Sequence, residues 1–292
     1  MKLLIIGSSG FVGSYLAAET EKSGIDYIGT SRKQIGGKNE KFDIKTDDIQ
    51  NVVKLHFNDT ATSNVAVICS SVCKIDLCKT NFEESYIVNV TGTKKIVDTL
   101  DDFGFKTVFI STDNVFDGEK GYYSETDVAT PVNEYGRQKR NIEKYLLERS
   151  ENNLVLRLSK VVGCKSSEPH PFDEWYRLAT QHKEIYTIRG NIFSPTYVFD
   201  VAKGILCAIK NGLTGVYHLC NNEHFSRTEL AQQFVNYFGF DTPVYEKDLE
   251  CFGFVENRPL KSYMCSDKFR NATDFSFTSM RAVMEKMEME NI

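Results

Sequence analysis

Short apolar runs alternate with helical patterns through the first half of the chain. Residues 2–6 form an apolar run that ends at a glycine, and residues 11–23 follow with apolar positions at helical spacing. This order predicts a strand, a tight turn and a helix. The alternation continues, with further strands predicted at residues 27–30, 65–69, 107–111 and 154–158, and further helices at residues 83–100 and 134–148.

This alternation predicts the fold class. Successive parallel strands need helical crossovers, and the crossovers cover both faces of the sheet. We therefore expect an α/β fold, with a doubly wound parallel sheet and a smaller C-terminal lobe. Residues 1–160 are predicted to form the sheet domain, to which residues 198–222 return with a helix and a strand. The rest of residues 161–292 is expected to form the lobe, so the two units interleave.

Composition and charge argue against several classes of protein. The chain has 292 residues and a formal net charge of −5, which does not favour a nucleic-acid partner because such partners need clustered cations. No run approaches the roughly 18 apolar residues of a membrane span, so no membrane association is expected. The eight cysteines contain no CxxC pair, and the group Cys69, Cys73 and Cys78 lacks further ligands at zinc-like spacing. We expect a cytoplasmic protein with reduced cysteines and no metal.

A glycine turn follows the first strand, in the segment GSSGFVG at residues 7–13. Glycine permits the backbone angles of such a turn and lets a pyrophosphate approach the N-terminus of the next helix. The turn therefore predicts a Rossmann sheet that binds a nicotinamide dinucleotide. The residues expected to contact this cofactor are Gly7, Ser9, Gly10, Phe11, Val12 and Gly13.

The end of the second predicted strand favours NADP(H) over NAD(H). A site for NAD(H) would carry an acidic residue there to bind the ribose hydroxyls. This chain has Ser31 and Arg32, and a guanidinium with a hydroxyl can bind a 2'-phosphate. The alternative is that Arg32 is a solvated surface charge. Asp43 and Ile44 follow a later loop, where the carboxylate is expected to meet the adenine.

Three residues predict the chemistry. Tyr135 and Lys139 form a YxxxK pair, so both side chains lie on one face of a helix, one turn apart. A nearby ammonium favours loss of the phenol proton. Thr112 lies just past the fourth strand, where its hydroxyl can polarise a carbonyl oxygen.

With these motifs in this order, the sequence resembles the extended short-chain dehydrogenase/reductase superfamily, and within it the dTDP-4-dehydrorhamnose reductase branch. The resemblance covers nearly the whole chain. Its motifs are GSSGFVG, NVTGTKKIVD at 89–98, STDNVFDG at 111–118, YSETDVATPVNEYGRQKR at 123–140, RLSKVVG at 157–163, SPTYVFDVA at 194–202, GVYHLCN at 215–221 and ENRPLKSYMCSDKF at 256–269.

The resemblance implies an NADPH-dependent reductase of a nucleoside-diphosphate 4-keto-6-deoxysugar, in deoxysugar biosynthesis. Tyr135 would donate the proton, Lys139 would lower the pKa of Tyr135 and hold the nicotinamide ribose, and Thr112 would orient the substrate oxygen. By the same likeness, the residues that line or brace the cofactor site are Cys69, Ser70, Ser71, Asn89, Leu158 and Ser159. The expected substrate-binding residues are Asp113, Asn114, Val115 and Arg258. Trp175 is added to them because the only tryptophan of the chain could stack on a base or a sugar.

Alternatives remain open. Asn114 stands where the branch usually has tyrosine, and dehydratases of the superfamily carry a glutamate there, so in a dehydratase Asp113 would have to serve as the base alone. The rivals are a nucleotide-sugar epimerase or dehydratase that recycles its cofactor, and a non-catalytic NADP-binding regulatory subunit. Trp175 could instead fill the core, and Arg258 could form a surface salt bridge. A homodimer is compatible with the resemblance.

Overall fold

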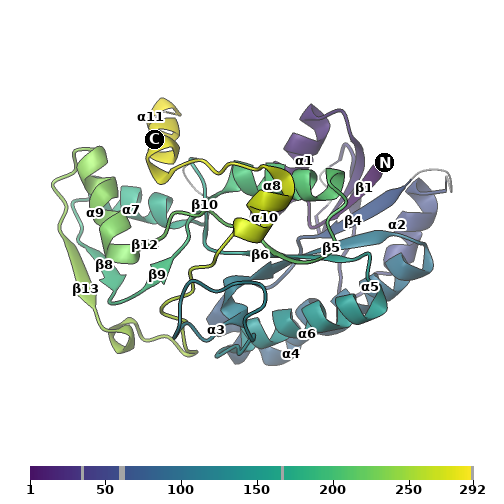
Figure 1. Cartoon of the computed structure of the whole chain (residues 1–292), viewed down its shortest axis with the longest axis horizontal. Helices are drawn as coiled ribbons and strands as arrows, with labels where there is room; N and C mark the ends of the chain where they lie inside the picture. The colour runs from purple at the N-terminus through teal and green to yellow at the C-terminus, as the bar shows by residue number, and fades with distance from the viewer. Residues whose placement is uncertain (34–35, 59–62, 166–167, 291–292) are drawn as a thin grey trace.

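A seven-stranded parallel sheet forms the centre of the protein (Figure 1), in the order β11-β6-β5-β4-β1-β2-β3. The computed structural model describes residues 1–33, 36–58, 63–165 and 168–290. The strands of the sheet are β1 (Lys2–Ile6), β2 (Asp26–Ser31), β3 (Asn39–Lys41), β4 (Asn64–Ile68), β5 (Lys106–Thr112), β6 (Leu154–Leu158) and β11 (Gly215–His218). The predicted α/β fold with a doubly wound parallel sheet is confirmed.

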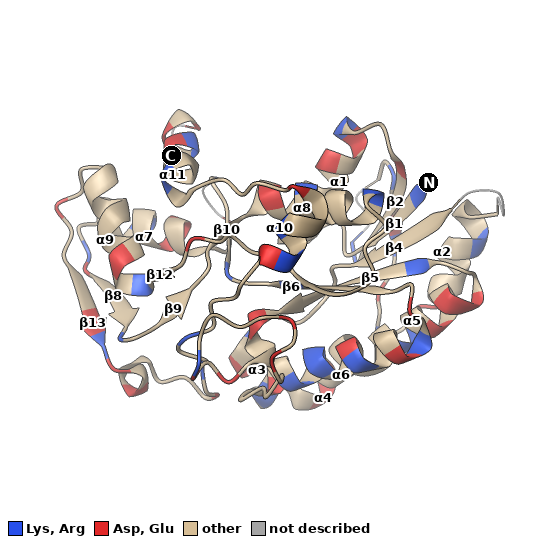
Figure 2. Cartoon of the chain, viewed as in Figure 1, with Lys and Arg blue, Asp and Glu red and all other residues tan. Residues whose placement is uncertain are grey.

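Helices cover both faces of this sheet. One face packs against α1 (Phe11–Lys22) and α8 (Val198–Lys210), and the other against α2 (Ile49–His56), α5 (Thr93–Asp102) and α6 (Glu134–Arg149). Alternate residues of β1 serve the two cores, with Leu3 and Ile5 in one and Leu4 and Ile6 in the other. The central strands carry few charged residues, whereas the helices carry many (Figure 2). A sheet that is apolar on both faces explains why its strands appear as short apolar runs.

The strand order fixes where a ligand binds. From β1 the chain continues to β2 and β3 on one side, and it then crosses back to β4 on the other side. Two helical connections diverge at such a switch point, and they leave a crevice at the carboxyl ends of the strands. The glycine turn after Ile6 and the loop after Ile68 border this crevice.

The elements that the sequence patterns missed include β3 and α2 of the sheet domain, and one predicted helix is interrupted. The polar strand β3 lies at the edge of the sheet and pairs only with β2, so it has no apolar alternation. Helix α2 was also not predicted. The predicted helix 83–100 is instead α4 (Phe82–Tyr86), a π-helical segment η1 (Ile87–Gly92) and α5. The wider turns of η1 follow from the role of Asn89, which is described below.

The C-terminal part forms a smaller lobe around two helices, α7 (Pro171–Thr180) and α9 (Arg227–Tyr237). Two small strand pairs flank them: β8 (Ile185–Ile188) with β13 (Val244–Lys247), and β9 (Ile192–Phe193) with β12 (Phe225–Ser226). A third pair, β7 (Val161–Val162) with β10 (Thr196–Tyr197), packs against α8 instead. The remaining elements are α3 (Ile75–Thr80), η2 (Asp113–Val115), η3 (Leu249–Phe252), α10 (Asp267–Thr273) and α11 (Met280–Met289).

One apolar core runs through the sheet and the lobe. It contains Val108 and Leu156 of the sheet together with Phe172 and Phe234 of the lobe. Both α8 and β11 lie with the sheet, as expected for residues 198–222. Because the core is shared, the exact division into two units stays a prediction. In the described part of the chain, no helix combines the length and the apolar character needed to cross a membrane.

Candidate active site

A large cavity of about 970 Å³ lies at the carboxyl ends of the strands and extends to the C-terminal lobe. The predicted residues that line it are Gly7, Ser9, Gly10, Phe11, Val12, Gly13, Ser31, Arg32, Asp43, Ile44, Cys69, Ser70, Ser71, Thr112, Asp113, Asn114, Tyr135, Lys139, Leu158, Ser159 and Arg258. The cavity therefore brings together residues from both ends of the chain.

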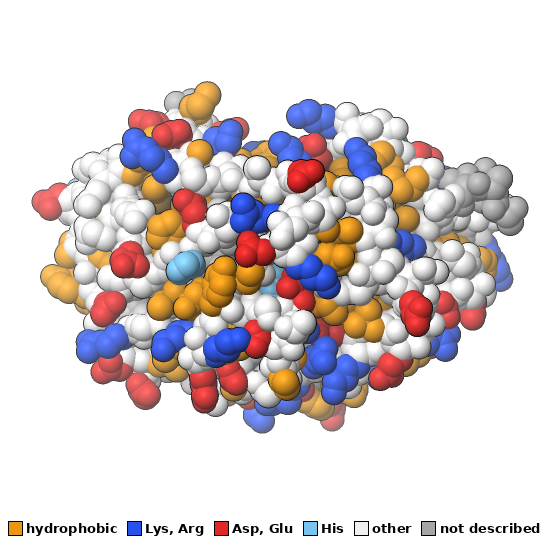
Figure 3. All heavy atoms as spheres, viewed as in Figure 1, with side chains coloured by type: hydrophobic (Ala, Val, Ile, Leu, Met, Phe, Trp, Pro, Cys, Tyr) orange, Lys and Arg blue, Asp and Glu red, His pale blue; other side chains and the backbone are white. Residues whose placement is uncertain are grey.

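The charge of this cavity differs from that of the whole protein. The net charge of the chain is −5, and the face drawn in Figure 3 carries both signs interspersed. The cavity lining, however, contains seven Lys and Arg residues and four Asp and Glu residues. A concave, positively charged wall attracts anions because low-dielectric surroundings strengthen the field. The cavity thus suits ligands that carry phosphate or carboxylate groups.

Two predicted substrate contacts need correction, because the structure places both residues in the core. Val115 is fully buried beside Phe116 and Tyr123, and it does not line the cavity. Trp175 is 1% exposed and packs against Phe172, so no base or sugar can stack on it in this structure. The core alternative holds for Trp175, because the apolar face of α7 points into the shared core.

The glycine turn closes tightly over the end of β1. Gly7 has φ of +89°, in the region that favours glycine, and its N–H donates to Thr30 Oγ1 at 3.2 Å. A Cβ on Gly13 would lie 2.1 Å from the carbonyl oxygen of Gly7, so the turn and the first turn of α1 touch. Helix α1 begins at Phe11 after an extended Gly10, with no side chain capping it. Its first N–H groups are thus available to a phosphate.

A buried hydroxyl supports the dinucleotide assignment. Ser70 lines the cavity, and its Oγ is buried without a hydrogen-bond partner among the described residues. An unpaired buried hydroxyl is costly unless a ligand completes it. The loop of Ser70 is fixed, because the N–H groups of Cys69 and Ser70 both donate to the carbonyl oxygen of Ile6. The residues of this crevice therefore fit a dinucleotide.

The predicted 2'-phosphate site lies at the end of β2. Ser31 Oγ donates to Ser9 Oγ at 2.9 Å, which joins the strand end to the glycine turn. Arg32 is exposed and lines the cavity, and within the described residues no hydrogen bond or ion pair holds its guanidinium. Asp43 also lines the cavity, and its Oδ1 accepts from the N–H of Lys45 at 3.0 Å.

Asn89 supports the loop that follows β4, residues 69–72, and does not itself line the cavity. Its Oδ1 accepts from the N–H of Val72 at 2.8 Å and from Ser71 Oγ at 3.0 Å. Its Nδ2 donates to Gln138 Oε1 at 2.8 Å, which links the loop to helix α6. The π-helical turn around Asn89 lets one side chain reach both neighbours.

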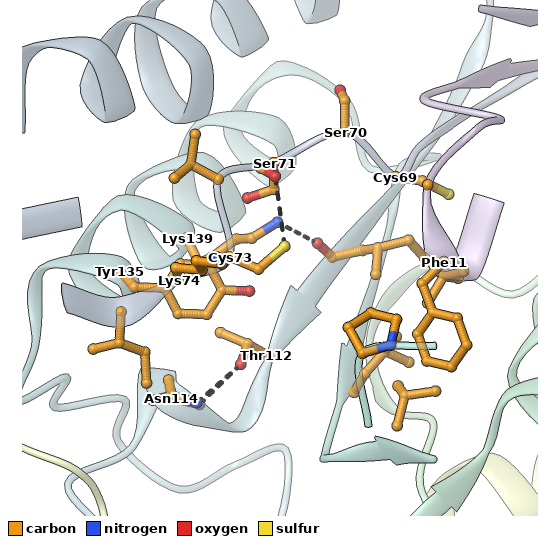
Figure 4. Close-up of a pocket in the computed structure, with 18 of the residues that line it drawn as sticks. Phe11, Cys69, Ser70, Ser71, Cys73, Lys74, Thr112, Asn114, Tyr135 and Lys139 are labelled. Atoms are coloured by element: carbon orange, nitrogen blue, oxygen red, sulfur yellow. Dashed lines mark hydrogen bonds between the residues drawn. The ribbon is translucent and has the colours of Figure 1, made fainter. Parts of the chain in front are cut away.

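Tyr135, Lys139 and Thr112 gather at one end of the cavity, with Cys73 beside them (Figure 4). Burial raises the pKa of Tyr135 well above its usual value, and a hydrogen bond with Thr112 offsets this only in part. Lys139 Nζ donates to the carbonyl oxygen of Ile110 at 2.8 Å and lies 5.9 Å from the centre of the Tyr135 ring. Burial lowers the pKa of Lys139 itself. Burial therefore sets the direction of the Tyr135 pKa, and the expected lowering by Lys139 does not appear among its main causes.

The turn that carries Thr112 rests directly on helix α6. A Cβ on Gly136 would lie 2.0 Å from the carbonyl oxygen of Asn114, so only glycine fits after Tyr135. Asn133 caps the helix by accepting from the N–H of Gly136 at 2.9 Å, and its Nδ2 donates to Asn114 Oδ1 at 3.1 Å. These contacts fix Tyr135 and Thr112 relative to each other.

Asp113 is a structural carboxylate rather than a free base. Its Oδ2 accepts from Ser262 Oγ at 2.8 Å and Ser159 Oγ at 3.3 Å, and its Oδ1 accepts from Asn114 Nδ2 at 2.9 Å and Thr112 Oγ1 at 3.1 Å. Burial raises its pKa although these four donors act to lower it. The four bonds tie β5, β6 and the C-terminal segment together. A dehydratase that relies on Asp113 as its base is therefore disfavoured.

A buried ion pair anchors helix α6 beneath the catalytic residues. Glu143 lies one turn after Lys139, and it accepts from Arg157 Nε at 2.9 Å and Arg157 Nη2 at 2.8 Å. Ser111 Oγ also donates to it at 2.6 Å. Arg157 outweighs burial and lowers the pKa of the Glu143 carboxyl. The pair joins α6 to β5 and β6, the strands that end at Thr112 and at Leu158.

The C-terminal lobe contributes cations to the opposite wall. Arg258 Nη2 pairs with Asp76 Oδ2 at 2.8 Å, and the guanidinium lies 4.3 Å from the centre of the Phe254 ring. Arg258 thus forms a salt bridge and lines the cavity as well. Lys160 and Arg227 also line it, and neither was predicted. Lys160 directly follows Ser159, whereas no sequence motif pointed to Arg227.

The predicted absence of a metal concerned Cys69, Cys73 and Cys78. Cys73 is exposed in the cavity and Cys78 is buried, with its thiol bonded to the carbonyl oxygen of Val72. Within the described ranges, no three His, Cys, Asp or Glu side chains gather as metal ligands would.

The chain is similar to several known proteins in sequence and in fold. The chain is 26% identical over 268 residues to a dTDP-4-dehydrorhamnose reductase of Mycobacterium tuberculosis, covering 90% of this chain and 83% of that protein. It is 24% identical over 239 residues to methionine adenosyltransferase 2 subunit beta of Rattus norvegicus, covering 79% and 70%. The solved dTDP-4-dehydrorhamnose reductase of Bacillus anthracis in complex with NADP superposes with a TM-score of 0.86 and 25% identity, over 99% of each chain.

A family model covers almost the entire sequence. The model described as the RmlD substrate binding domain matches residues 1–291. With this match and the geometry above, the chain belongs to the RmlD substrate-binding domain family.

Proposed function

We propose that the protein is an NADPH-dependent reductase of a nucleoside-diphosphate 4-keto-6-deoxysugar and that it acts in deoxysugar biosynthesis. The observation that carries the proposal is the assembly of Tyr135, Lys139 and Thr112 at the inner end of a positively charged dinucleotide crevice. The reductases of Mycobacterium tuberculosis and Bacillus anthracis, by their names, point to the same reaction class. An intact catalytic set also argues against a purely regulatory subunit.

The residues supply a proton path for carbonyl reduction. The nicotinamide, when bound, supplies the hydride to the keto carbon. Tyr135 donates the proton to the carbonyl oxygen, and its raised pKa keeps the phenol protonated although it also makes the phenol a weaker acid. Thr112 Oγ1 donates to Asp113 at 3.1 Å, so its hydroxyl has to turn from Asp113 to the substrate oxygen. Lys139 holds the cofactor ribose and the end of β5.

NADPH is the proposed cofactor because Ser31 and Arg32 occupy the end of β2, where a carboxylate would repel a 2'-phosphate. Arg258 is proposed to bind the substrate's diphosphate from the lobe, since it lines the cavity and retains donors beyond its bond to Asp76. We place the reaction in the cytoplasm, and we propose a homodimer that light scattering would test.

One assay separates the proposal from its rivals. The protein is mixed with NADPH and a dTDP-4-keto-6-deoxyhexose, while the absorbance of the reduced nicotinamide and the identity of the sugar are followed. A reductase consumes one NADPH for each sugar reduced. A changed sugar without net consumption of NADPH would indicate an epimerase or dehydratase. No change with dTDP-, GDP-, CDP- and UDP-linked sugars would indicate a binding subunit.

A further inference from the structure

Two cations on the lobe side of the cavity have no role in the proposed chemistry. Lys160 follows β6, and its carbonyl oxygen accepts from the N–H of Thr196 at 3.0 Å. Arg227 is the first residue of α9, and its N–H donates to the carbonyl oxygen of Asn191 at 2.8 Å. Both side chains line the cavity. Their positions are set by fixed backbone, so they belong to the wall of the cavity.

The positive charge of this pair is only partly neutralised by the protein, because Arg227 has one distant carboxylate partner in Glu174. Among the residues that the structure describes, the ammonium of Lys160 has no hydrogen bond and no ion pair. The nearest carboxylate oxygen to Arg227 is Glu174 Oε2, at 3.8 Å from Nη2. Lys160 is exposed to solvent within the cavity, yet desolvation by the surrounding wall and the charge of Arg227 both lower its pKa. Two cations that repel each other in a partly desolvated wall are stabilised when an anion binds between them.

The pair lies towards the catalytic end of the cavity. Lys160 directly follows Ser159, whose Oγ donates to Asp113 Oδ2 at 3.3 Å, and Asp113 lines the same cavity. Cys73 also lines it, lies beside Lys139 and influences Tyr135 (Figure 4). This location differs from that of Arg32 at the end of β2, and also from that of Arg258, which Asp76 and Phe254 hold. The cavity thus has a cationic group next to the reacting centre in addition to those proposed for the cofactor and the diphosphate.

We infer that Lys160 and Arg227 together bind an oxyanion of the substrate next to the reacting carbon. A lysine supplies a mobile point charge and an arginine supplies a planar fork, and the two together suit a phosphate or a carboxylate. Two groups of a nucleotide sugar have this chemistry: the phosphate that joins the sugar, and a carboxylate on the sugar ring. A 6-deoxysugar has no carboxylate, so the proposed substrate offers only the phosphate, and binding of a carboxylate would mean that the sugar is a uronate instead. The inference rests on the proposed function in that the sugar lies beside Tyr135.

Binding measurements test the site without requiring turnover. Calorimetry in saturating NADP⁺ compares dTMP, dTDP, UDP-glucose and UDP-glucuronate as ligands of the full-length protein. The variants are Lys160→Gln and Arg227→Gln, and Lys183→Gln is the control because this exposed lysine lies outside the cavity. Circular dichroism and the Kd for NADP⁺ establish that each variant is folded.

Each result has a defined meaning. If the site binds the sugar-linked phosphate, Lys160→Gln raises the Kd for dTDP and for both UDP-sugars by about tenfold or more. The Kd for dTMP, which lacks that phosphate, stays unchanged. If the site binds a sugar carboxylate, the variant raises only the Kd for UDP-glucuronate. The control Lys183→Gln is expected to leave every Kd within about twofold of the wild-type value. If Lys160→Gln does the same, the oxyanion site is wrong, while the proposed function still stands. A wild-type protein that binds none of the four ligands would overturn the proposed function too.

Discussion

The two walls of the cavity are built on different principles. At the catalytic end, Lys139 is bonded to Ile110 at 2.8 Å and Asp113 accepts four hydrogen bonds, so each polar group already has protein partners. On the lobe wall, Lys160 lacks such a partner among the described residues, and Arg227 has only a carboxylate at 3.8 Å. The comparison teaches that the groups proposed to react are held in place in advance by the protein, whereas the cations proposed for recognition leave donors for a ligand.

The largest effect is expected from Tyr135→Phe. Removal of the hydroxyl leaves the carbonyl oxygen without its proton donor, so kcat should fall by about 10² to 10⁴ while the Kd for NADPH stays unchanged. Stopped-flow oxidation of NADPH measures the rate, and Tyr186→Phe serves as an exposed control in the lobe. If the variant retains near-normal turnover, the proton comes from another group.

A second test removes the anchor beneath the catalytic residues. Glu143→Gln leaves Arg157 buried and without its counter-charge, so the free energy of unfolding should fall by about 3–5 kcal/mol. Urea denaturation measures this loss. Glu148→Gln, at an exposed position of the same helix, should change stability little. Equal stability of the two variants would show that the pair does not anchor α6.

The cofactor end tests whether an exposed cation discriminates between cofactors. Arg32→Ser removes the group proposed to hold the 2'-phosphate, so the Kd for NADPH should rise by about tenfold while the Kd for NADH stays the same. Lys33→Ser is the matched control, because this neighbouring cation does not line the cavity. An equal rise in the Kd for NADPH and for NADH would mean that Arg32 supports the loop after β2 and does not bind the 2'-phosphate.

The last prediction is a pH dependence of stability, which is confined to acidic pH. Burial and the charge of Arg157 lower the pKa of His218 to about 3, and its backbone is held by Glu125. Below pH about 6.5 the unfolded chain takes up a proton that the folded chain excludes, so stability falls as the pH drops from about 6.5 to 3. Urea denaturation at several pH values gives the slope of the unfolding free energy against pH. His218→Gln should reduce this slope by the equivalent of up to one proton. An unchanged slope would mean that His218 is not excluded from protonation.

The difference between the walls also explains what the sequence could predict. Tyr135, Lys139 and the glycine turn are local patterns, in which spacing along one helix or one turn already fixes the geometry. Arg227 enters the cavity only because α9 packs on the lobe, and no local pattern reports that packing. Lys160 was adjacent to predicted residues, but a loop after a strand does not reveal which side chains face the cavity.

The same reasoning applies to the errors. Trp175 was a candidate because a lone tryptophan can stack on a ligand, yet helix α7 turns it into the shared core. The π-helical turn at Ile87–Gly92 departs from helical periodicity by tertiary contacts of Asn89, which the apolar pattern of residues 83–100 does not contain. Tertiary packing, rather than local propensity, decided each case.

The central claim is that this cavity transfers a hydride from the nicotinamide to the keto carbon of a nucleotide sugar. Its most direct test is reduction of a dTDP-4-keto-6-deoxyhexose with NADPH deuterated at carbon 4 in each of its two configurations. One configuration should place a single deuterium on carbon 4 of the sugar, with one NADPH consumed per product, as read by mass spectrometry and NMR. A product without deuterium from either cofactor, or a changed sugar with no net NADPH consumption, would contradict the account.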